Sequence, residues 1–357
     1  MIRCMAARSS ASRRGPQCTR RSALAILSIS GATLLSACSD SGLSDAPGPS
    51  DGLGPTREPD PAVSADVPDA EVLLATLTST RAALAACSTV ADTASQRLTR
   101  VCAVIEKQHD VLVRLIEAGS LDFDDRATAT SLPGDEAAST GELSEAEASA
   151  VAKARVEAEA EAETTVASVL AEQSTGASIV DALIAVSPTN LPTLMALHGQ
   201  RAAAAEILGA AVTWPEVAGP LGPGAITVVA GLRQAVYGFE ILVSRSTKKE
   251  RETYSAALRP LREASRTVTE LAGEAAPVAP LGYGLPTDVE NKEERRQLAT
   301  DLLTALPQAV IAGSAARAGD RDAIAGTLRL MSLSVRLGMS FAVPTAPFPG
   351  LTVPDAP

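Results

Sequence analysis

Two histidines and three glutamates are the residues of this chain whose types and spacing could bind a metal ion. Glu106 and His109 form a Glu-x-x-His sequence, whose spacing places a carboxylate and an imidazole on one face of a helix. His198, Glu159 and Glu163 fall in step with apolar residues of two further predicted helices. Oxygen and nitrogen ligands of this kind suit iron, manganese or zinc. One hypothesis is therefore a metal-binding or redox protein that uses these side chains.

His109 is expected to face the interior because it continues an apolar stripe with steps of three and four. The stripe consists of Leu98, Cys102, Ile105, His109, Leu112 and Ile116. The metal motif is nevertheless incomplete, since Met195 and not glutamate lies three residues before His198. No Ser/His/Asp order, glycine-rich phosphate loop or paired-cysteine metal motif is present in the sequence. A non-catalytic protein without a cofactor is the preferred interpretation.

The elements that position these residues are predicted to be helices almost throughout. Aromatic residues make up only 2% of the chain, and a composition rich in alanine, leucine and valine suits closely packed helices. Apolar periodicity predicts helices at 69–89, 94–118, 144–173, 177–186, 190–212, 225–244, 250–274, 290–318 and 321–341. Pro307 is expected to kink the helix that contains it.

A cluster of glycines and prolines at 219–224 divides the predicted helices into two sets. The expected fold is all-α, with two consecutive four-helix bundles at 69–213 and 225–343. A proline-rich, extended tail is expected at 344–357.

Cys87 and Cys102 flank the predicted turn between the first two helices almost symmetrically. A disulfide that ties two antiparallel helices is the preferred interpretation, because residues 1–37 resemble an export signal and thus predict an oxidising compartment. The alternative is that both are small buried apolar residues.

The first 37 residues carry six arginines and no acidic residue, and they include a 15-residue apolar run from Ala23 to Ala37. A run this short is not a permanent membrane span but is typical of an export signal. Arg20 and Arg21, directly ahead of the run, predict twin-arginine export, with the general secretion route as the alternative.

Leu35-Ser36-Ala37-Cys38 resembles the bacterial lipobox, in which the cysteine is acylated and becomes the first residue of the mature chain. The alternative is an ordinary signal peptide that contains a cysteine. Two or more acyl chains give stable membrane attachment. The predicted location is the extracytoplasmic face of the cell membrane, with a disordered Ser/Asp/Gly/Pro-rich tether at 38–68. The net charge of −11 argues against nucleic acid and against anionic headgroups as partners of the folded part.

Three short motifs occur in order in the second half: Ala235-Val-Tyr-Gly238, Tyr283-Gly-Leu-Pro286 and Phe348-Pro-Gly-Leu351. Behind a lipobox, they resemble a ferritin-like helical family of unknown function found in bacterial exported proteins and lipoproteins. The resemblance covers about residues 225–351 and implies a ferritin-like four-helix bundle in an extracytoplasmic setting. It implies no known reaction, and the second half contains no histidine for a di-iron site.

Arg233, Tyr237 and Glu240 have spacings of four and three, so they are expected to line one face of their helix. One hypothesis is a buried or half-buried polar network in which Arg233 replaces the charge of a metal; the alternative is a solvated Arg–Glu pair on the outer face. Taken together, the sequence predicts a membrane-anchored lipoprotein with degenerate ferritin-like bundles. Its expected role is binding or scaffolding, with an unidentified envelope protein or component as the partner.

Overall fold

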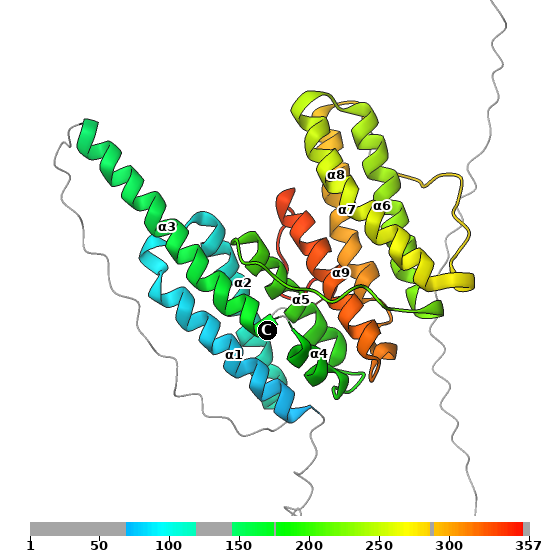
Figure 1. The fold of residues 1–357 in the computed structure, drawn as a ribbon, viewed down its shortest axis with the longest axis horizontal. Helices are drawn as coiled ribbons and strands as arrows, with labels where there is room; N and C mark the ends of the chain where they lie inside the picture. Colours follow the sequence, from blue (N-terminus) through cyan, green and yellow to red (C-terminus); the bar gives the residue numbers. More distant parts are fainter. Residues whose placement is uncertain (1–68, 119–144, 175, 286–288, 353–357) are drawn as a thin grey trace, which may run out of the picture. The chain divides into compact units, whose positions relative to one another are not determined.

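The computed structural model describes residues 69–118, 145–174, 176–285 and 289–352, and within these ranges the regular structure is entirely helical (Figure 1). This confirms the predicted all-α class. Cys38, Arg20, Arg21 and the tether lie outside the described residues. The α-helices are α1 (Ala70–Thr89), α2 (Gln96–Ala118), α3 (Glu145–Ser174), α4 (Ala177–Ile184), α5 (Leu191–Ile207), α6 (Ile226–Arg245), α7 (Lys248–Ala272), α8 (Lys292–Ile311) and α9 (Arg321–Ser340).

Two helices end earlier than the periodicity predicts, because glycines in the left-handed region follow them. Gly209 has φ 101° just after α5, and Gly313 has φ 68° just after α8. Arg317 then folds back on α8 and donates to the carbonyl groups of Val310 and Ala312, at 2.8 and 3.1 Å. A buried arginine therefore completes the end of α8 where the predicted helix would have continued.

α5 lies at the centre of the core, and every residue from Leu194 to Ala205 is buried. Its alanines and Gly199 leave room for neighbours on all sides. A Cβ atom on Gly199 would lie 2.5 Å from Cγ of Met331, so α5 and α9 are in close contact there. One hydrophobic cluster includes residues of α1, α2 and α4 to α9. The two predicted sets of helices thus share a common core, and their division into two separate bundles stays a prediction.

The backbone also makes a close contact between α9 and the glycine-rich segment that precedes α6. A Cβ atom on Gly326 would lie 1.8 Å from the carbonyl oxygen of Gly219. We expect Gly326→Ala to lower the free energy of unfolding by about 2 kcal/mol or more, because backbone must shift to admit a methyl group. Urea unfolding measures the loss. Gly284→Ala is the control, because a methyl group added there would have no atom within 4 Å and the backbone is not left-handed. Equal losses in the two variants would contradict the contact.

Two described helical stretches, Ala70–Thr89 and Gly222–Arg245, are long and apolar enough to span a membrane by length and composition. Both contribute buried side chains to the hydrophobic cores, among them Leu77 of α1 and Phe239 of α6. Apolar side chains of these two stretches therefore pack against other helices of the chain.

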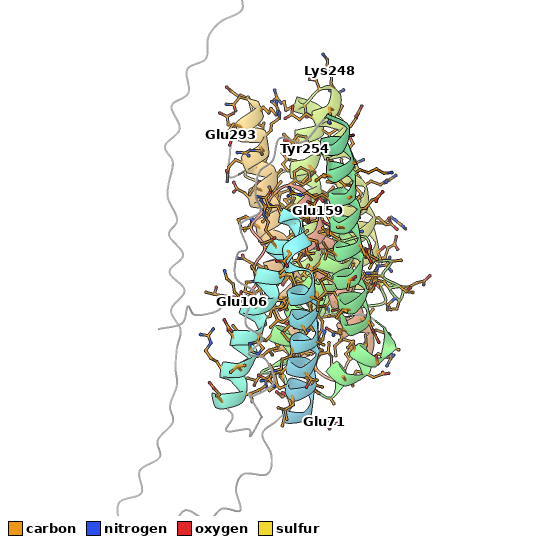
Figure 2. All side chains as sticks on the ribbon, turned by 90° about the vertical axis from the view of Figure 1, so that its left-hand side faces the viewer. Glu71, Glu106, Glu159, Lys248, Tyr254 and Glu293 are labelled. Carbon is orange, nitrogen blue, oxygen red and sulfur yellow. A yellow bond between two sulfur atoms is a disulfide. The ribbon has the colours of Figure 1, made fainter. Side chains whose placement is uncertain are left out.

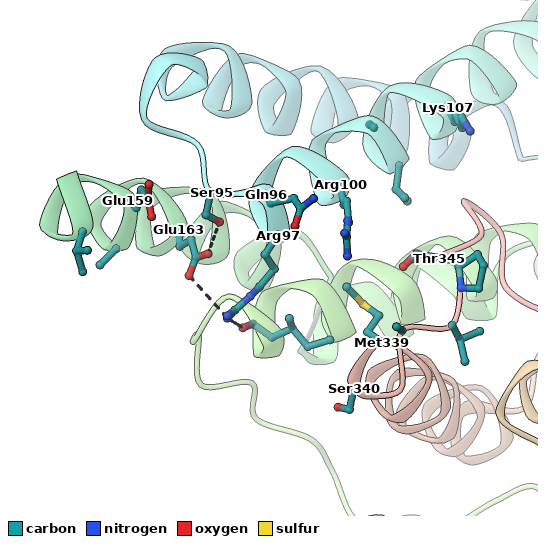
Figure 3. Close-up of a pocket in the computed structure, with 18 residues that line it drawn as sticks. Ser95, Gln96, Arg97, Arg100, Lys107, Glu159, Glu163, Met339, Ser340 and Thr345 are labelled. Carbon is teal, nitrogen blue, oxygen red and sulfur yellow. Dashed lines mark hydrogen bonds and ion pairs between the residues drawn. The ribbon is translucent and has the colours of Figure 1, made fainter. Parts of the chain in front are cut away.

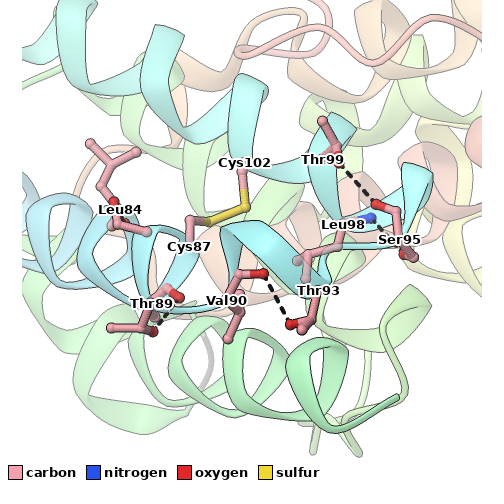
Figure 4. The surroundings of a disulfide bond; sticks show 11 residues. Leu84, Cys87, Thr89, Val90, Thr93, Ser95, Leu98, Thr99 and Cys102 are labelled. Carbon is pink, nitrogen blue, oxygen red and sulfur yellow. Dashed lines mark hydrogen bonds between the residues drawn. A yellow bond between two sulfur atoms is a disulfide. The ribbon is translucent and has the colours of Figure 1, made fainter. Parts of the chain in front are cut away.

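Cys87 and Cys102 form the predicted disulfide, with an S–S distance of 2.18 Å and a Cα–Cα distance of 5.9 Å (Figure 4). A single turn of 3₁₀-helix, Ala91–Thr93, joins the two helices. The hydroxyl of Ser95 accepts from the amide of Leu98 at 3.1 Å, which caps the start of α2. The disulfide joins the end of α1 to the first part of α2.

Candidate functional site

The side chains proposed as metal ligands do not converge. Glu106 is exposed on α2, and Glu159, on α3, is ion-paired with Arg155 at 2.9 Å (Figure 2). His109 is partly buried and its Nδ1 lies 3.5 Å from a carboxylate oxygen of Asp110, its neighbour on α2. Within the described residues, no three His, Cys, Asp or Glu side chains are placed to share a metal ion. The structure therefore provides no site for the metal hypothesis.

His109 lies at the edge of the buried stripe of α2, because its side chain is partly buried and its Nε2 atom is enclosed. Ile105 is fully buried, and the next buried position of α2 is Gln108 rather than His109. Steps of three and four are both compatible with a helical stripe. In α2 the fully buried positions follow the step of three, from Ile105 to Gln108. Gln108 therefore lies deeper in the core than His109, its neighbour on the predicted stripe.

Glu163 and the first half of α3 also differ from the prediction. Glu163 accepts a hydrogen bond from the Ser95 hydroxyl at 2.5 Å, so it holds the start of α2. Residues 149–157 are all exposed, Val156 among them, so no apolar face is buried in this part of α3. An alanine-rich sequence with an i,i+4 ion pair such as Lys153–Glu157, at 3.7 Å, favours a helix without apolar burial.

His198 is buried in α5. Burial lowers its pKa from 6.5 to about 3, and the nearby charge of Arg201 contributes to the decrease. A backbone hydrogen bond with Gln173 acts in the opposite direction and raises the pKa, but its effect is smaller. The imidazole is therefore neutral in the folded protein at physiological pH. A neutral imidazole is able to bind a metal, but in the described part of the chain His198 belongs to no group of three His, Cys, Asp or Glu side chains that could hold one.

This burial predicts a pH dependence of stability. The unfolded chain protonates His198 below about pH 6.5, whereas the folded chain resists protonation until about pH 3. The stabilisation is complete above the unfolded pKa and is lost as the pH falls toward the folded one. Between about pH 7 and about pH 4.5 we expect the wild type to lose about 2–3 kcal/mol more than His198→Leu. Urea unfolding across this range measures it, and parallel curves for the two proteins would contradict it.

A second buried group, Arg201 of α5, was not predicted from the sequence. Its Nε donates to the Gln108 side-chain oxygen at 2.9 Å, and its terminal nitrogens donate to the hydroxyls of Ser79, at 3.1 Å, and Thr80. Burial lowers its pKa to about 9, so it remains charged at neutral pH. All of these partners are neutral. The sequence signal was the presence of Arg201 within the long apolar stretch of its helix.

Gln108 extends this network to the C-terminal tail. Its amide nitrogen donates to the side-chain oxygen of Gln200 and to the backbone carbonyl of Pro347, both at 2.8 Å. Phe348, the next residue, is fully buried. The described part of the tail is therefore attached to the helical core through a hydrogen bond and an aromatic anchor. We refer to Arg201, Gln108, Gln200, Ser79 and Thr80 as the Arg201 network.

A groove of about 1230 Å³ lies between α2, α3 and the end of α9 (Figure 3). α2 provides one wall and α3 another, and the segment after α9 provides a third. The lining residues are Ser95, Gln96, Arg97, Arg100, Ala103, Val104, Lys107, Val156, Glu159, Ala160, Glu163, Ile207, Met339, Ser340, Ala342, Val343, Pro344 and Thr345. We call this the α2–α9 groove.

The charges along the groove are only partly neutralised. Arg97 donates to the Ile207 carbonyl at 3.2 Å and lies 3.8 Å from Glu163. Arg100 and Lys107 also lie on the α2 wall, and neither makes an ion pair or a hydrogen bond through its side chain with the described residues. Within the described residues, the groove therefore presents two cations that are not paired with an acid.

Arg233, Tyr237 and Glu240 do not form the buried network that one hypothesis required. Glu240 is half exposed and is bound by Arg262 of α7, at 2.7 Å. Arg233 donates instead to the backbone carbonyl of Pro277, in the connection between α7 and α8. The three side chains share a helix face but bind different partners, because each reaches a different neighbouring segment. The contacts of Arg233 and Glu240 therefore do not join them in one network.

The motifs that carry the family resemblance occupy packing positions. The rings of Tyr237 and Tyr283, from the first and second motifs, lie 5.4 Å apart. A Cβ atom on Gly238 would lie 2.2 Å from Leu302, so α6 and α8 approach closely there. Phe348, from the third motif, is buried. These residues hold helices together rather than forming a reactive site.

No family model, no curated protein and no solved structure matches this chain. The ferritin-like resemblance therefore stays a prediction, and the function is argued from the sequence and the site alone.

Proposed function

We propose that this protein is a non-catalytic binding protein, attached by lipid at Cys38 to the extracytoplasmic face of the cell membrane. Export by the twin-arginine route, and a degenerate ferritin-like bundle formed by α6 to α9, belong to the same proposal. The observation that carries the binding role is the α2–α9 groove. In this proposal the groove receives a component of the cell envelope.

The size of the groove favours a polymer over a small metabolite. Its volume of about 1230 Å³ exceeds the range of about 300–1,000 Å³ that is usual for small-molecule pockets. Its lining also mixes charged, polar and apolar side chains from three separate segments of the chain. Such a surface is suited to contact over a length of partner rather than to enclosure of one group.

Photo-crosslinking in intact cells tests the binding role. A photoreactive amino acid at Ala103, an exposed residue in the groove, is expected to form a discrete adduct with an envelope component. The control places the same amino acid at Ala256, which is exposed on α7 outside the groove. Adducts of equal yield from both positions, or none from Ala103, would contradict a binding function of the groove.

A further inference from the structure

We infer that the α2–α9 groove binds an extended, acidic peptide segment, which pairs its backbone with the segment after α9 and directs its carboxylates toward α2. This inference rests on the proposed binding function and specifies the chemistry of the partner. Two independent features of the groove support it. One wall carries cations, and another carries main-chain groups, that have no partner among the residues the structure describes.

The cations lie on the α2 wall. Lys107 follows Arg100 after about two turns of helix, or about 10 Å along the axis. On one face of an extended peptide, side chains recur about every 7 Å. Carboxylates two or four residues apart therefore come within reach of the two long cationic side chains. The groove's own acids do not compete, because Glu159 is paired with Arg155 and Glu163 is held by the Ser95 hydroxyl.

The main-chain groups lie on the wall formed by the segment after α9. The amides of Ala342 and Val343 are bonded to the end of α9, at 3.1 and 2.9 Å. Beyond them, Pro344 and Thr345 line the groove, and neither makes a hydrogen bond with the described part of the chain. The Thr345 amide and the carbonyls of both residues are thus open to a second backbone. Addition of an extended peptide to such a segment is a recurrent mode of recognition.

These features favour a peptide over an anionic lipid surface. A lipid headgroup would use the charges of Arg100 and Lys107 but would leave the backbone at Thr345 without a partner. A peptide satisfies both walls, and apolar side chains on its other face would meet Val343 and Met339, which also line the groove.

Fluorescence anisotropy with the full-length protein in zwitterionic detergent tests the inference. The probe is a short fluorescent peptide in which glutamate and valine alternate. Compared with wild type, the double variant Arg100→Glu/Lys107→Glu should weaken binding at least about tenfold, because two attractions become repulsions. Lys248→Glu/Lys249→Glu makes the same change of charge on exposed residues of α7, outside the groove, and should change the affinity by less than about twofold.

Two further probes separate the two walls. Replacing every glutamate of the peptide by glutamine should weaken binding about tenfold, and so should N-methylation of the peptide backbone. Equal affinity for the glutamine peptide, loss of binding in the Lys248/Lys249 control, or no binding of the acidic peptide would overturn the inference. So would binding to phosphatidylglycerol vesicles in place of the peptide. A crosslinked adduct at Ala103 in cells, combined with any of these failures, would keep the binding function and reject only the acidic peptide.

Discussion

Phe348→Ala is expected to destabilise the protein by about 3–5 kcal/mol, as large-to-small changes at buried aromatic residues do. Phe348 is fully buried in the main hydrophobic cluster, which includes residues of α8 and α9. The adjacent Gly350 packs so closely on α8 that a Cβ atom there would lie 2.6 Å from the Pro307 carbonyl oxygen. This contact limits how far the tail can move to fill the cavity.

Urea or thermal unfolding measures the effect, and the midpoint should fall with little change in the slope. Leu281→Ala is the matched control, because that apolar side chain is fully exposed and its removal should change stability by less than about 0.5 kcal/mol. If Phe348→Ala were as stable as the control, the tail would not be part of the core.

Gln108→Leu is the second change with a large expected effect, about 3 kcal/mol of destabilisation. The substitution leaves the Nε group of a buried, charged Arg201 without its acceptor, and removal of one partner of a buried charge is strongly destabilising. It also removes the hydrogen bond from Gln108 to the Pro347 carbonyl. Chemical unfolding at pH 7 measures the loss.

The double variant Gln108→Leu/Arg201→Met provides the sharper comparison. Ser79 and Thr80 remain satisfied in it, because their hydroxyls also donate to the Thr76 carbonyl, at 2.8 and 2.6 Å. Replacement of a whole buried polar pair by apolar side chains is often close to neutral. We therefore expect the double variant to be more stable than Gln108→Leu alone. A loss equal to the sum of the two single variants would show that the residues act independently.

The sequence was sufficient to predict the helical class, most helix boundaries and the disulfide. Periodicity, glycine and proline report directly on local structure, and Cys87 and Cys102 are close together in the chain as well as in space. The early ends of α5 and α8 were missed because Gly209 and Gly313 act through backbone conformation, which an apolar pattern does not report.

The arrangement of the site could not be predicted in the same way. A stripe with steps of three and four does not decide which of Gln108 and His109 lies deeper in the core. Gln108 does, because it bonds to Gln200 and Arg201 of α5. The groove depends on Lys107 and Thr345, which are distant in sequence, so local patterns carry no signal for it. Whether the two sets of helices pack together could not be predicted, because the glycine- and proline-rich segment before α6 marks a turn of the chain and does not report the contacts across it.

Lipid attachment at Cys38 is the property on which the proposed location and function both depend. Mass spectrometry of the N-terminal peptide, from protein extracted from membranes, measures it directly. We expect a mature chain that begins at Cys38 with a diacylglyceryl group on the sulfur, and we expect Cys38→Ser to lack that group and leave the membrane fraction. A wild-type chain that keeps the residues before Cys38, or that carries a free thiol at this position, would contradict the proposal.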